Sequence, residues 1–329
     1  MSAFSRADWE RLRELRQGFL AAQSRPEPAA SADYFRCARD VELYDQTFAR
    51  RIEWKWAAAL REVELRAREF APKSVLDWAC GSGAAVRALL ASPVGARVER
   101  VTLFERSSLA REHARRSLLA LRPGLEVRSA NSAADCDAEL ALASHVLDEL
   151  DERAEAELEA TLRRCSSAIL LESGALATSR RLGRLRARLV GEFDVLAPCT
   201  HRGACGALAD PAQWCHLFAR PPGEVFQDAL WSEFSRMLEI DLRSLSYSFV
   251  ALTRAPQARD ESIARILGRP RLLKGRALVD ACSAEGLATL TLLQREDRQL
   301  FKSLEQPSNE PRLWRFERDG SRIRGPQAL

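Results

Sequence analysis

S-V-L-D-W-A-C-G-S-G-A-A-V-R-A-L-L, residues 74–90, reads as a short apolar strand, a glycine-containing turn and the start of a helix. A strand that passes through a tight turn into a helix is typical of the opening unit of a doubly wound α/β fold. The glycines allow the backbone to approach a ligand, and the start of the helix offers free N–H groups. This stretch therefore predicts a nucleotide-type fold with its ligand at the turn.

Further apolar runs alternate with helical patterns after this unit. Runs that are apolar throughout predict parallel strands that are covered by helices on both faces. The predicted fold class is therefore α/β, with a Rossmann-like doubly wound sheet. The predicted strands lie within residues 98–107, 125–130, 138–150 and 166–174, and a final pair lies within 193–198 and 246–254.

The turn D-W-A-C-G-S-G resembles the acid-x-G-x-G-x-G signature of class I S-adenosylmethionine-dependent methyltransferases more than the G-x-G-x-x-G turn of dinucleotide enzymes. It departs at Ala79, where the first glycine is usual. The resemblance implies that Asp77, Gly81 and Gly83 flank the methionine part of the cofactor. Glu105 ends the second strand, where an acid is placed to accept the two hydroxyls of a ribose. The predicted cofactor-binding residues are Asp77, Ala79, Gly81, Ser82, Gly83, Glu105, Arg106 and Ser144.

The methyl acceptor is expected at the end of the fourth strand, where Ser144 and His145 stand. Enzymes that methylate amino groups of nucleic acids usually carry an Asp/Asn-Pro-Pro-aromatic motif at this position, and this chain has Ala143-Ser144-His145-Val146-Leu147 instead. His145 is the candidate catalytic residue because an imidazole can act as a base near neutral pH. A structural role for this histidine is the alternative.

Composition narrows the class of protein. Hydrophobic residues make up 46% of the 329 residues and charged residues 29%, as in a globular protein with a large core. The sequence contains no run of about 18 apolar residues, so we expect no membrane-spanning helix. The N-terminal residues 1–12 mix acids and bases and show no apolar signal core, so we expect a reducing compartment.

The predicted organisation has three parts: a helical region over residues 1–70, the methyltransferase-like domain over 71–256, and a small β-rich unit over 257–329. Pro26 and Pro28 separate two helical pieces in the first part. The chain is expected to be a monomer. Two arginine-rich stretches suit phosphate backbones, unless they are solvated surface: residues 180–188 and residues 265–276.

Three of the eight cysteines lie in the insertion at residues 197–216, in a segment broken by proline, glycine and aspartate. A disulfide, a nucleophile, a metal site and chance burial are the possible explanations. The Pro198-Cys199 pair is superficially similar to the nucleophile of cytosine-C5 RNA methyltransferases, but it follows the sixth strand instead of the fourth. Four thiolates fit an iron–sulfur cluster or zinc, and the irregular spacing without C-x2-C knuckles favours a 4Fe-4S cluster. The predicted ligands are Cys199, Cys205, Cys215 and Cys282, whereas Cys37, Cys80, Cys136 and Cys165 are expected to be small buried side chains.

The segments A-P-C-T-H-R-G-A-C, D-P-A-Q-W-C-H and D-A-C-S-A-E-G resemble the mitochondrial small-subunit ribosomal protein 22 family, the methyltransferase-like ribosome assembly factors. The resemblance covers roughly residues 34–300. It implies a cytoplasmic location for a bacterial member and a mitochondrial location for a eukaryotic one. It implies a class I methyltransferase fold, association with the small ribosomal subunit, and a four-iron, four-sulfur cluster on the four cysteines named above. Thr200 and Gly206 replace two prolines of the family pattern.

The sequence therefore predicts a factor that binds S-adenosylmethionine, contains an iron–sulfur cluster and acts on small-subunit rRNA, with no membrane partner. A non-catalytic RNA-binding assembly protein is the first alternative, because Ala79 and the plain segment around Ser144 depart from active enzymes. A methyltransferase of small molecules is the second. Salt-dependent RNA binding would separate it from the other two.

Overall fold

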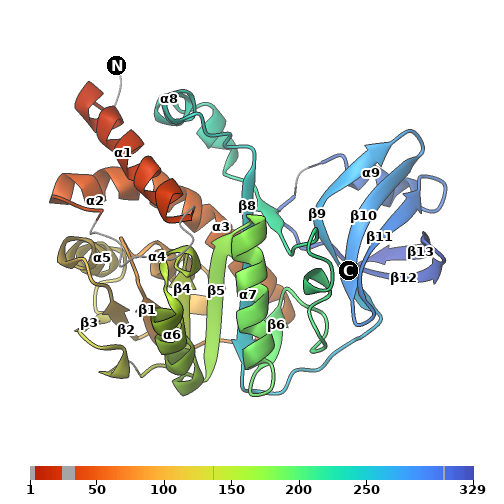
Figure 1. The fold of residues 1–329 in the computed structure, drawn as a ribbon, viewed down its shortest axis with the longest axis horizontal. Coiled ribbons are helices and arrows are strands. Elements are labelled where there is room, and N and C mark those ends of the chain that lie inside the picture. Colours follow the sequence, from red (N-terminus) through yellow and green to blue (C-terminus); the bar gives the residue numbers. More distant parts are fainter. Residues whose placement is uncertain (1–3, 24–33, 136, 307) are drawn as a thin grey trace.

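A mixed sheet runs through the centre of the molecule, and a β-barrel lies beside it (Figure 1). The structure is a computed structural model that describes residues 4–23, 34–135, 137–306 and 308–329. Pro26, Pro28 and Cys136 lie outside the described residues. Among the described helices, none is both long and apolar enough to cross a bilayer.

The sheet is built from the runs that the sequence predicts, with one short strand added after the cysteine-rich segment. Its order is β3-β2-β1-β4-β5-β8-β6, and β7 pairs with β8 beyond the end of β6. Strands β1 to β5 are parallel to one another, while β8 runs antiparallel between β5 and β6. The strands are β1 (Ser74–Trp78), β2 (Arg100–Phe104), β3 (Glu126–Ala130), β4 (Leu140–Ser144), β5 (Ser167–Ser173), β6 (Asp194–Ala197), β7 (Leu217–Ala219) and β8 (Leu245–Thr253).

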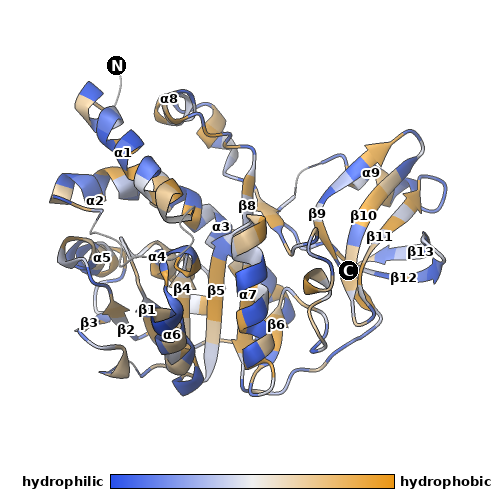
Figure 2. Ribbon diagram, in the orientation of Figure 1, coloured by the Kyte–Doolittle hydropathy of each residue, from blue (hydrophilic) through white to orange (hydrophobic). Residues whose placement is uncertain are grey.

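Helices cover both faces of this sheet, so its central strands are buried on both sides. All five residues of β1 are buried, and β5 is buried over six of its seven. Figure 2 shows these apolar strands between helices that carry polar outer faces. One face packs against α3, α4 and α5, and the other packs against α6 and α7. The helices are α3 (Arg50–Arg66), α4 (Ala84–Leu90), α5 (Ser108–Leu121), α6 (Glu152–Arg164) and α7 (Leu176–Leu189).

This topology confirms the predicted fold class, a class I methyltransferase-like α/β fold with a helical N-terminal extension and a small β-rich C-terminal unit. A reversal of strand order between β1 and β4 leaves a crevice at the carboxyl ends of the strands, where ligands bind in such folds. The division of the chain at residues 70 and 256 stays a prediction.

The N-terminal helices extend across the carboxyl ends of the sheet. A π-helical turn, η1, joins α2 to α3, so the chain runs helically from residue 38 to residue 66. Helix α1 packs against α8, which follows the cysteine-rich segment, through Leu12, Leu15 and Phe234. Trp54 of α3 contacts Trp231 of α8 at a ring-centroid distance of 4.8 Å. The elements are α1 (Arg6–Gln23), α2 (Ala38–Tyr44), η1 (Asp45–Ala49) and α8 (Ala229–Leu238).

The C-terminal unit is a closed barrel with the strand order β10-β11-β13-β12-β9. Its interior is apolar and is filled around Trp314 and Ile323. Outward-facing residues of one side, Leu267, Cys282 and Leu287, join the core of the α/β domain instead. The elements are β9 (Ile263–Leu273), β10 (Arg276–Ser283), β11 (Gly286–Leu293), α9 (Arg298–Ser303), β12 (Leu313–Asp319) and β13 (Arg322–Ala328).

Candidate functional site

The turn after β1 has the left-handed backbone that glycine favours. Gly81 and Gly83 have φ values of 53° and 86°, and Ala79 has φ 55° although it carries a side chain. A Cβ on Gly83 would lie 3.1 Å from the Cβ of Ala114 on α5, so the close packing of this turn also calls for glycine. The turn therefore keeps the backbone of a glycine-rich loop at the position where the sequence has Ala79.

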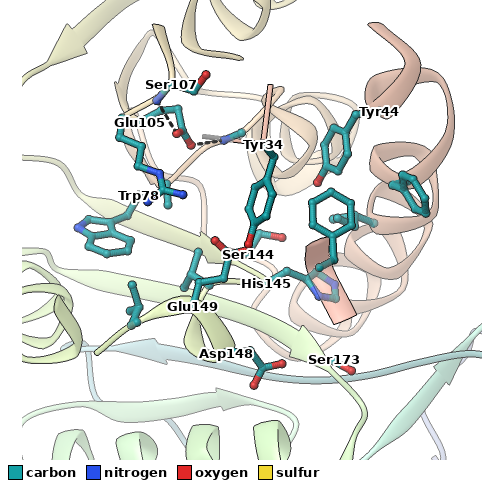
Figure 3. Close-up of a pocket in the computed structure, with 18 of the residues that line it drawn as sticks. Tyr34, Tyr44, Trp78, Glu105, Ser107, Ser144, His145, Asp148, Glu149 and Ser173 are labelled. Carbon is teal, nitrogen blue, oxygen red and sulfur yellow. Dashed lines mark hydrogen bonds between the residues drawn. The ribbon is translucent and has the colours of Figure 1, made fainter. Parts of the chain in front are cut away.

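A cavity of about 970 Å³ opens at the carboxyl ends of β1, β2 and β4 (Figure 3). A volume of this size suits a nucleoside-sized ligand. Three residues of the predicted cofactor set, Asp77, Ser82 and Gly83, lie behind the lining. The predicted residues that line the cavity are Ala79, Gly81, Glu105, Arg106, Ser144 and His145.

Glu105 is held by backbone amides on the wall of this cavity. Its carboxylate accepts the N–H groups of Gly81 and Ser107, each at 2.9 Å, and Figure 3 shows both bonds. The Gly81 bond ties the end of β2 to the turn after β1. The carboxylate thus presents a fixed negative charge where the sequence predicts the ribose hydroxyls.

Asp77 is fully buried beneath the turn. Neither of its carboxylate oxygens has a hydrogen-bond partner in the part of the chain that the structure describes. Burial, with a contribution from the charge of Glu105, raises the pKa of Asp77 to about 8. A buried carboxyl without a partner favours a nearby cation, which would restore its ionised form.

At the end of β4, Ser144 accepts a hydrogen bond from the indole Nε1 of Trp56 at 2.9 Å. His145 follows with φ 56° and lines the cavity. Burial, and then the charges of Lys55 and Arg51, hold the pKa of His145 well below its usual range. The imidazole is therefore neutral at physiological pH and can only be a weak base.

Glu172, at the end of β5, stabilises the backbone that follows His145. Its carboxylate accepts the N–H groups of Val146 and Leu147 at 3.0 and 3.1 Å, which fixes the turn that carries His145. Burial raises the pKa of Glu172 to about 8.

Several lining residues are absent from the sequence prediction. Asn131 directly follows β3, so the rule that found Glu105 at the end of β2 could also have found it. Tyr44 and Lys55 reach the cavity from the N-terminal helices. The sequence allows Lys55 to line a site but favours a surface role for it, and no local signal marks Tyr44. Burial lowers the pKa of Lys55 to about 7, with Arg51 contributing.

The four predicted ligand cysteines come together where the insertion meets the barrel, in a region that we call the cysteine joint. Cys199, Cys205 and Cys215 come from the insertion, and Cys282 comes from β10. Burial raises the pKa of Cys282 to about 12, with contributions from Cys199 and Cys205. Burial likewise holds the pKa of Cys215 well above its usual range, with contributions from the other three cysteines.

As placed, no three His, Cys, Asp or Glu side chains among the described residues could hold one metal ion. A group bound by the four thiols would therefore have to span them or draw them together. The described cysteines form no disulfide. Cys80 and Cys165 are buried, whereas the expected burial of Cys37 is wrong, because this thiol is exposed just before α2. Cys199 is not among the residues that line the cavity after β4, so it is not placed for a nucleophilic role there.

Arginines of α7 brace the cysteine-rich segment. Arg180 donates to the carbonyl oxygens of Ala207, Asp210 and Gln213 at 2.7–2.9 Å. Arg186, which is buried, donates to the carbonyl oxygens of His201 and Gly203. The alternative of a phosphate-binding surface at residues 180–188 is therefore wrong for these two side chains, because loop carbonyls already use their donors.

Further cations surround the thiols. Arg66 donates to the carbonyl oxygen of Cys199 at 2.8 Å. Arg265 is only 5% exposed and pairs with the buried Glu62 at 2.9 Å. Its Nε and Nη1 atoms, and His201 Nδ1, have no hydrogen-bond partner within the described residues. Buried donors without acceptors fit an anionic group at this site, and four thiolates would supply such charge.

The insertion is wedged tightly against the barrel. A Cβ on Gly206 would lie 2.4 Å from the backbone nitrogen of Leu287, so only glycine fits without a shift. His216 Nε2 lies where a Cβ on Gly268 would approach to 2.8 Å, and the N–H of Gly268 donates to the carbonyl oxygen of His216. Gly206, which replaces a proline of the family pattern, therefore allows the insertion to pack directly on the backbone of the barrel.

Comparison with solved structures finds distant likenesses. The magnesium protoporphyrin IX methyltransferase of Synechocystis, solved with bound SAH, is 10% identical, with coverage of 75% of this chain and 100% of that chain and a TM-score of 0.39. The plantazolicin methyltransferase BamL is 12% identical, with coverage of 74% and 98% and a TM-score of 0.41. No curated protein matches the sequence.

Comparison with protein families gives a clear result. Residues 46–307 match the family described as mitochondrial small ribosomal subunit Rsm22. This span includes the turn after β1, the cavity residues of the α/β domain and all four cysteines of the joint with the barrel. The match covers most of the chain, and the chain belongs to the Rsm22 family.

Proposed function

We propose that this protein binds S-adenosylmethionine, holds an iron–sulfur cluster on its four converging cysteines, and acts on the small ribosomal subunit or its rRNA. The observation that carries the proposal is the cavity at the end of β1. There the amide-held Glu105 lies beside the turn under which Asp77 is buried without a partner.

The charges of this cavity match the proposed cofactor. S-adenosylmethionine carries a positive sulfonium, which supplies a transferable methyl group, and a positive amino group. Asp77 and Glu105 are the acids placed to balance these charges, and Glu105 accepts hydroxyl hydrogens as well. Gly81 lets the backbone approach, while Ser144 and His145 stand at the acceptor side.

The charges around the cysteine joint likewise match an anionic group. Cys199, Cys205, Cys215 and Cys282 would hold the cluster, and Arg186 and Arg265 would balance its charge. A 4Fe-4S cluster supplies no methyl-transfer chemistry here. Its role would be to tie the barrel to the α/β domain, since ligation couples folding to the metal. Zinc on the same thiolates is the alternative.

Calorimetry on the full chain, purified without oxygen, tests the cofactor. We expect S-adenosylmethionine to bind wild type and to lose at least about 10-fold in affinity on Glu105→Ala, since a charged hydrogen-bonding group contributes about 1.5–3 kcal/mol. Glu112→Ala, an exposed acid of α5, is the matched control and should bind normally. Wild type without measurable binding would refute this part of the proposal.

Iron and sulfide analysis of the same sample tests the cluster. We expect about four irons per chain and a brown solution. A colourless protein with one zinc per chain would instead establish the zinc alternative.

A non-catalytic assembly protein is the second candidate, and Ala79 favours it, since this residue keeps a strained backbone where active enzymes have glycine. Methyl incorporation into small-subunit rRNA separates the two candidates. Cofactor binding with no incorporation into isolated rRNA or assembly intermediates would favour the second.

A further inference from the structure

The C-terminal barrel has a recognisable topology. If β9 to β13 are numbered one to five, the strands are neighbours around the barrel in the order 1-2-3-5-4, and strand four pairs with strand one to close it. Helix α9 lies between strands three and four in the sequence. Strands three and five, β11 and β13, are parallel, and the other neighbouring pairs are antiparallel. This is the arrangement of the OB-fold. Barrels of this kind bind oligonucleotides on the face of strands two and three and with the loops 1–2 and 4–5.

Part of that face is already covered here. Cys282 of β10 and Leu287 of β11 pack against the core of the α/β domain, and Gly206 of the insertion lies directly on Leu287. A ligand of the barrel must therefore bind at the opposite end of β10 and β11. Loop 1–2, which joins β9 to β10, and loop 4–5, which joins β12 to β13, lie at that end.

The two loops meet at that open end. The turn between β9 and β10 contacts the end of β11, where the N–H of Gln294 donates to the carbonyl oxygen of Gly275 at 3.0 Å. The turn between β12 and β13 contacts the same strand, where the N–H of Thr291 donates to Ser321 at 2.8 Å. The register places Arg276 opposite Leu293, and Arg322 opposite Thr291.

These loops present positive charge to solvent. Lys274, Arg276 and Arg322 are exposed and make no ion pair with any residue in the described ranges. The neighbouring acids are already engaged: Asp280 by Thr289, and Asp319 by Arg324. Alternation along β10 and β13 turns Ala277 and Ile323 into the barrel, so Arg276 and Arg322 point outward.

Exposed apolar surface adjoins the charge. Leu272 and Leu273 are 42% and 44% exposed on the same hairpin. No aromatic residue stands in either loop, so base stacking cannot dominate binding, and phosphate contacts must. This hairpin is also what remains of the second arginine-rich stretch, because Arg265 at its start is buried in the cysteine joint.

We propose that the loops 1–2 and 4–5 of this OB-fold barrel bind a single-stranded RNA segment through its phosphates, with Lys274, Arg276 and Arg322 as the contacts. The proposal rests on the proposed function, which supplies the small ribosomal subunit as the source of the RNA. The exposed positive charge of the two loops selects a polyanion, and the OB-fold topology, whose loops bind oligonucleotides, selects a single strand.

Fluorescence anisotropy of the full chain tests it, with a mixed-sequence RNA of about 12 nucleotides, within the roughly 4–16 that one OB-fold covers. Three lost phosphate contacts on a single strand change the salt slope by about 2 and the affinity by about 100-fold at about 0.1 M salt. We therefore expect this loss in the variant Lys274→Ala/Arg276→Ala/Arg322→Ala.

The matched control removes the same charge at the far edge of the α/β domain. Arg115→Ala/Arg116→Ala/Arg128→Ala alters exposed side chains of α5 and β3 and should change the affinity by less than about 3-fold. Limited proteolysis checks that the barrel of the first variant is folded. Calorimetry with S-adenosylmethionine checks the α/β domain of both variants, since none of the six residues lines the cavity.

The outcomes separate this inference from the proposed function. Wild-type affinity in the barrel variant, or an equal loss in the control, overturns the assignment to the barrel and leaves the proposed function intact. Equal affinity for a duplex of the same length overturns the choice of a single strand. A wild-type protein that binds no RNA overturns both.

Discussion

The cavity and the cysteine joint have opposite charge imbalances. Around the cavity, Asp77 and Glu172 are buried acids whose pKa values rise to about 8. At the joint, Nε and Nη1 of the buried Arg265 have no acceptor among the described residues, although Nη2 of the same side chain pairs with Glu62. The buried acids are thus short of positive charge, although Lys55 and Arg51 also line the cavity, and the joint is short of negative charge. These imbalances agree with the proposed function, since the proposed cofactor is positive where Asp77 is buried and the proposed cluster is negative where Arg265 is buried.

The largest expected effect separates the two regions completely. Cys282→Ser should reduce the iron content from about four per chain to near zero and loosen the barrel, because β10 has no second cysteine to replace it. Cofactor affinity should stay within about 2-fold. Iron analysis, calorimetry and limited proteolysis of the barrel measure these outcomes. Cys37→Ser, at an exposed thiol outside the joint, is the control, and unchanged iron in Cys282→Ser would remove this cysteine from the site.

The next effect concerns the acids. A carboxyl whose pKa is raised on folding binds more protons in the native state between its two pKa values, so stability falls as pH rises through that window. For Asp77 the window runs from about pH 4 to about pH 8. The free energy of unfolding of the cofactor-free protein should fall by up to about 5 kcal/mol across it, at 1.36 kcal/mol per unit.

Asp77→Asn should remove much of this slope, and it should be more stable than wild type at pH 8 while binding S-adenosylmethionine more weakly. Urea titrations at several pH values measure the slope. Asp137→Asn, at an exposed acid, should leave the wild-type profile unchanged. An Asp77→Asn profile parallel to wild type would show that Asp77 does not carry the imbalance.

A smaller effect tests the bracing of the joint without any metal. Arg180→Ala removes a side chain that donates to four loop carbonyls, and we expect the iron-free protein to lose about 2–4 kcal/mol of unfolding free energy. Arg184→Ala, one turn along α7 and exposed, should change it by less than about 0.5 kcal/mol. Equal losses in chemical denaturation would mean that α7, rather than the loop contacts, is being tested.

The smallest effect concerns the turn after β1. Ala79→Gly relieves a positive φ that costs about 1–2 kcal/mol, but it also loosens the unfolded chain by about 0.4–1 kcal/mol. We expect a net gain of about 0.5 kcal/mol in thermal or chemical unfolding. Ala96→Gly, at φ −59°, should instead destabilise the protein, and a loss on Ala79→Gly would show that the alanine side chain is itself needed.

The sequence predicts the cavity better than the joint, and the reason is the range over which each is specified. The strand, turn and helix of residues 74–90 are local, and Glu105 follows from the rule that polar residues end parallel strands. Lys55 and Tyr44 could not be found this way, because nothing local tells which helices cross the ends of the sheet.

The joint depends on contacts far apart in the chain. The spacing of the cysteines indicates the four thiols. The sequence wrongly predicts surface positions for Arg186 and Arg265, because a run of arginines looks the same whether its partners are phosphates or distant carbonyls. The OB-fold order of the barrel was likewise hidden, because alternation identifies strands without giving their pairing.

The position of β8 sets an order on the maturation of this protein. Among the described strands, β6 pairs only with β8, which is made nearly fifty residues later. During synthesis the segment that carries Cys199, Cys205 and Cys215 therefore emerges before the strand that anchors its base, and Cys282 emerges later still. The cavity is encoded almost entirely before the joint can close, so the joint is the last part of the nascent chain to mature.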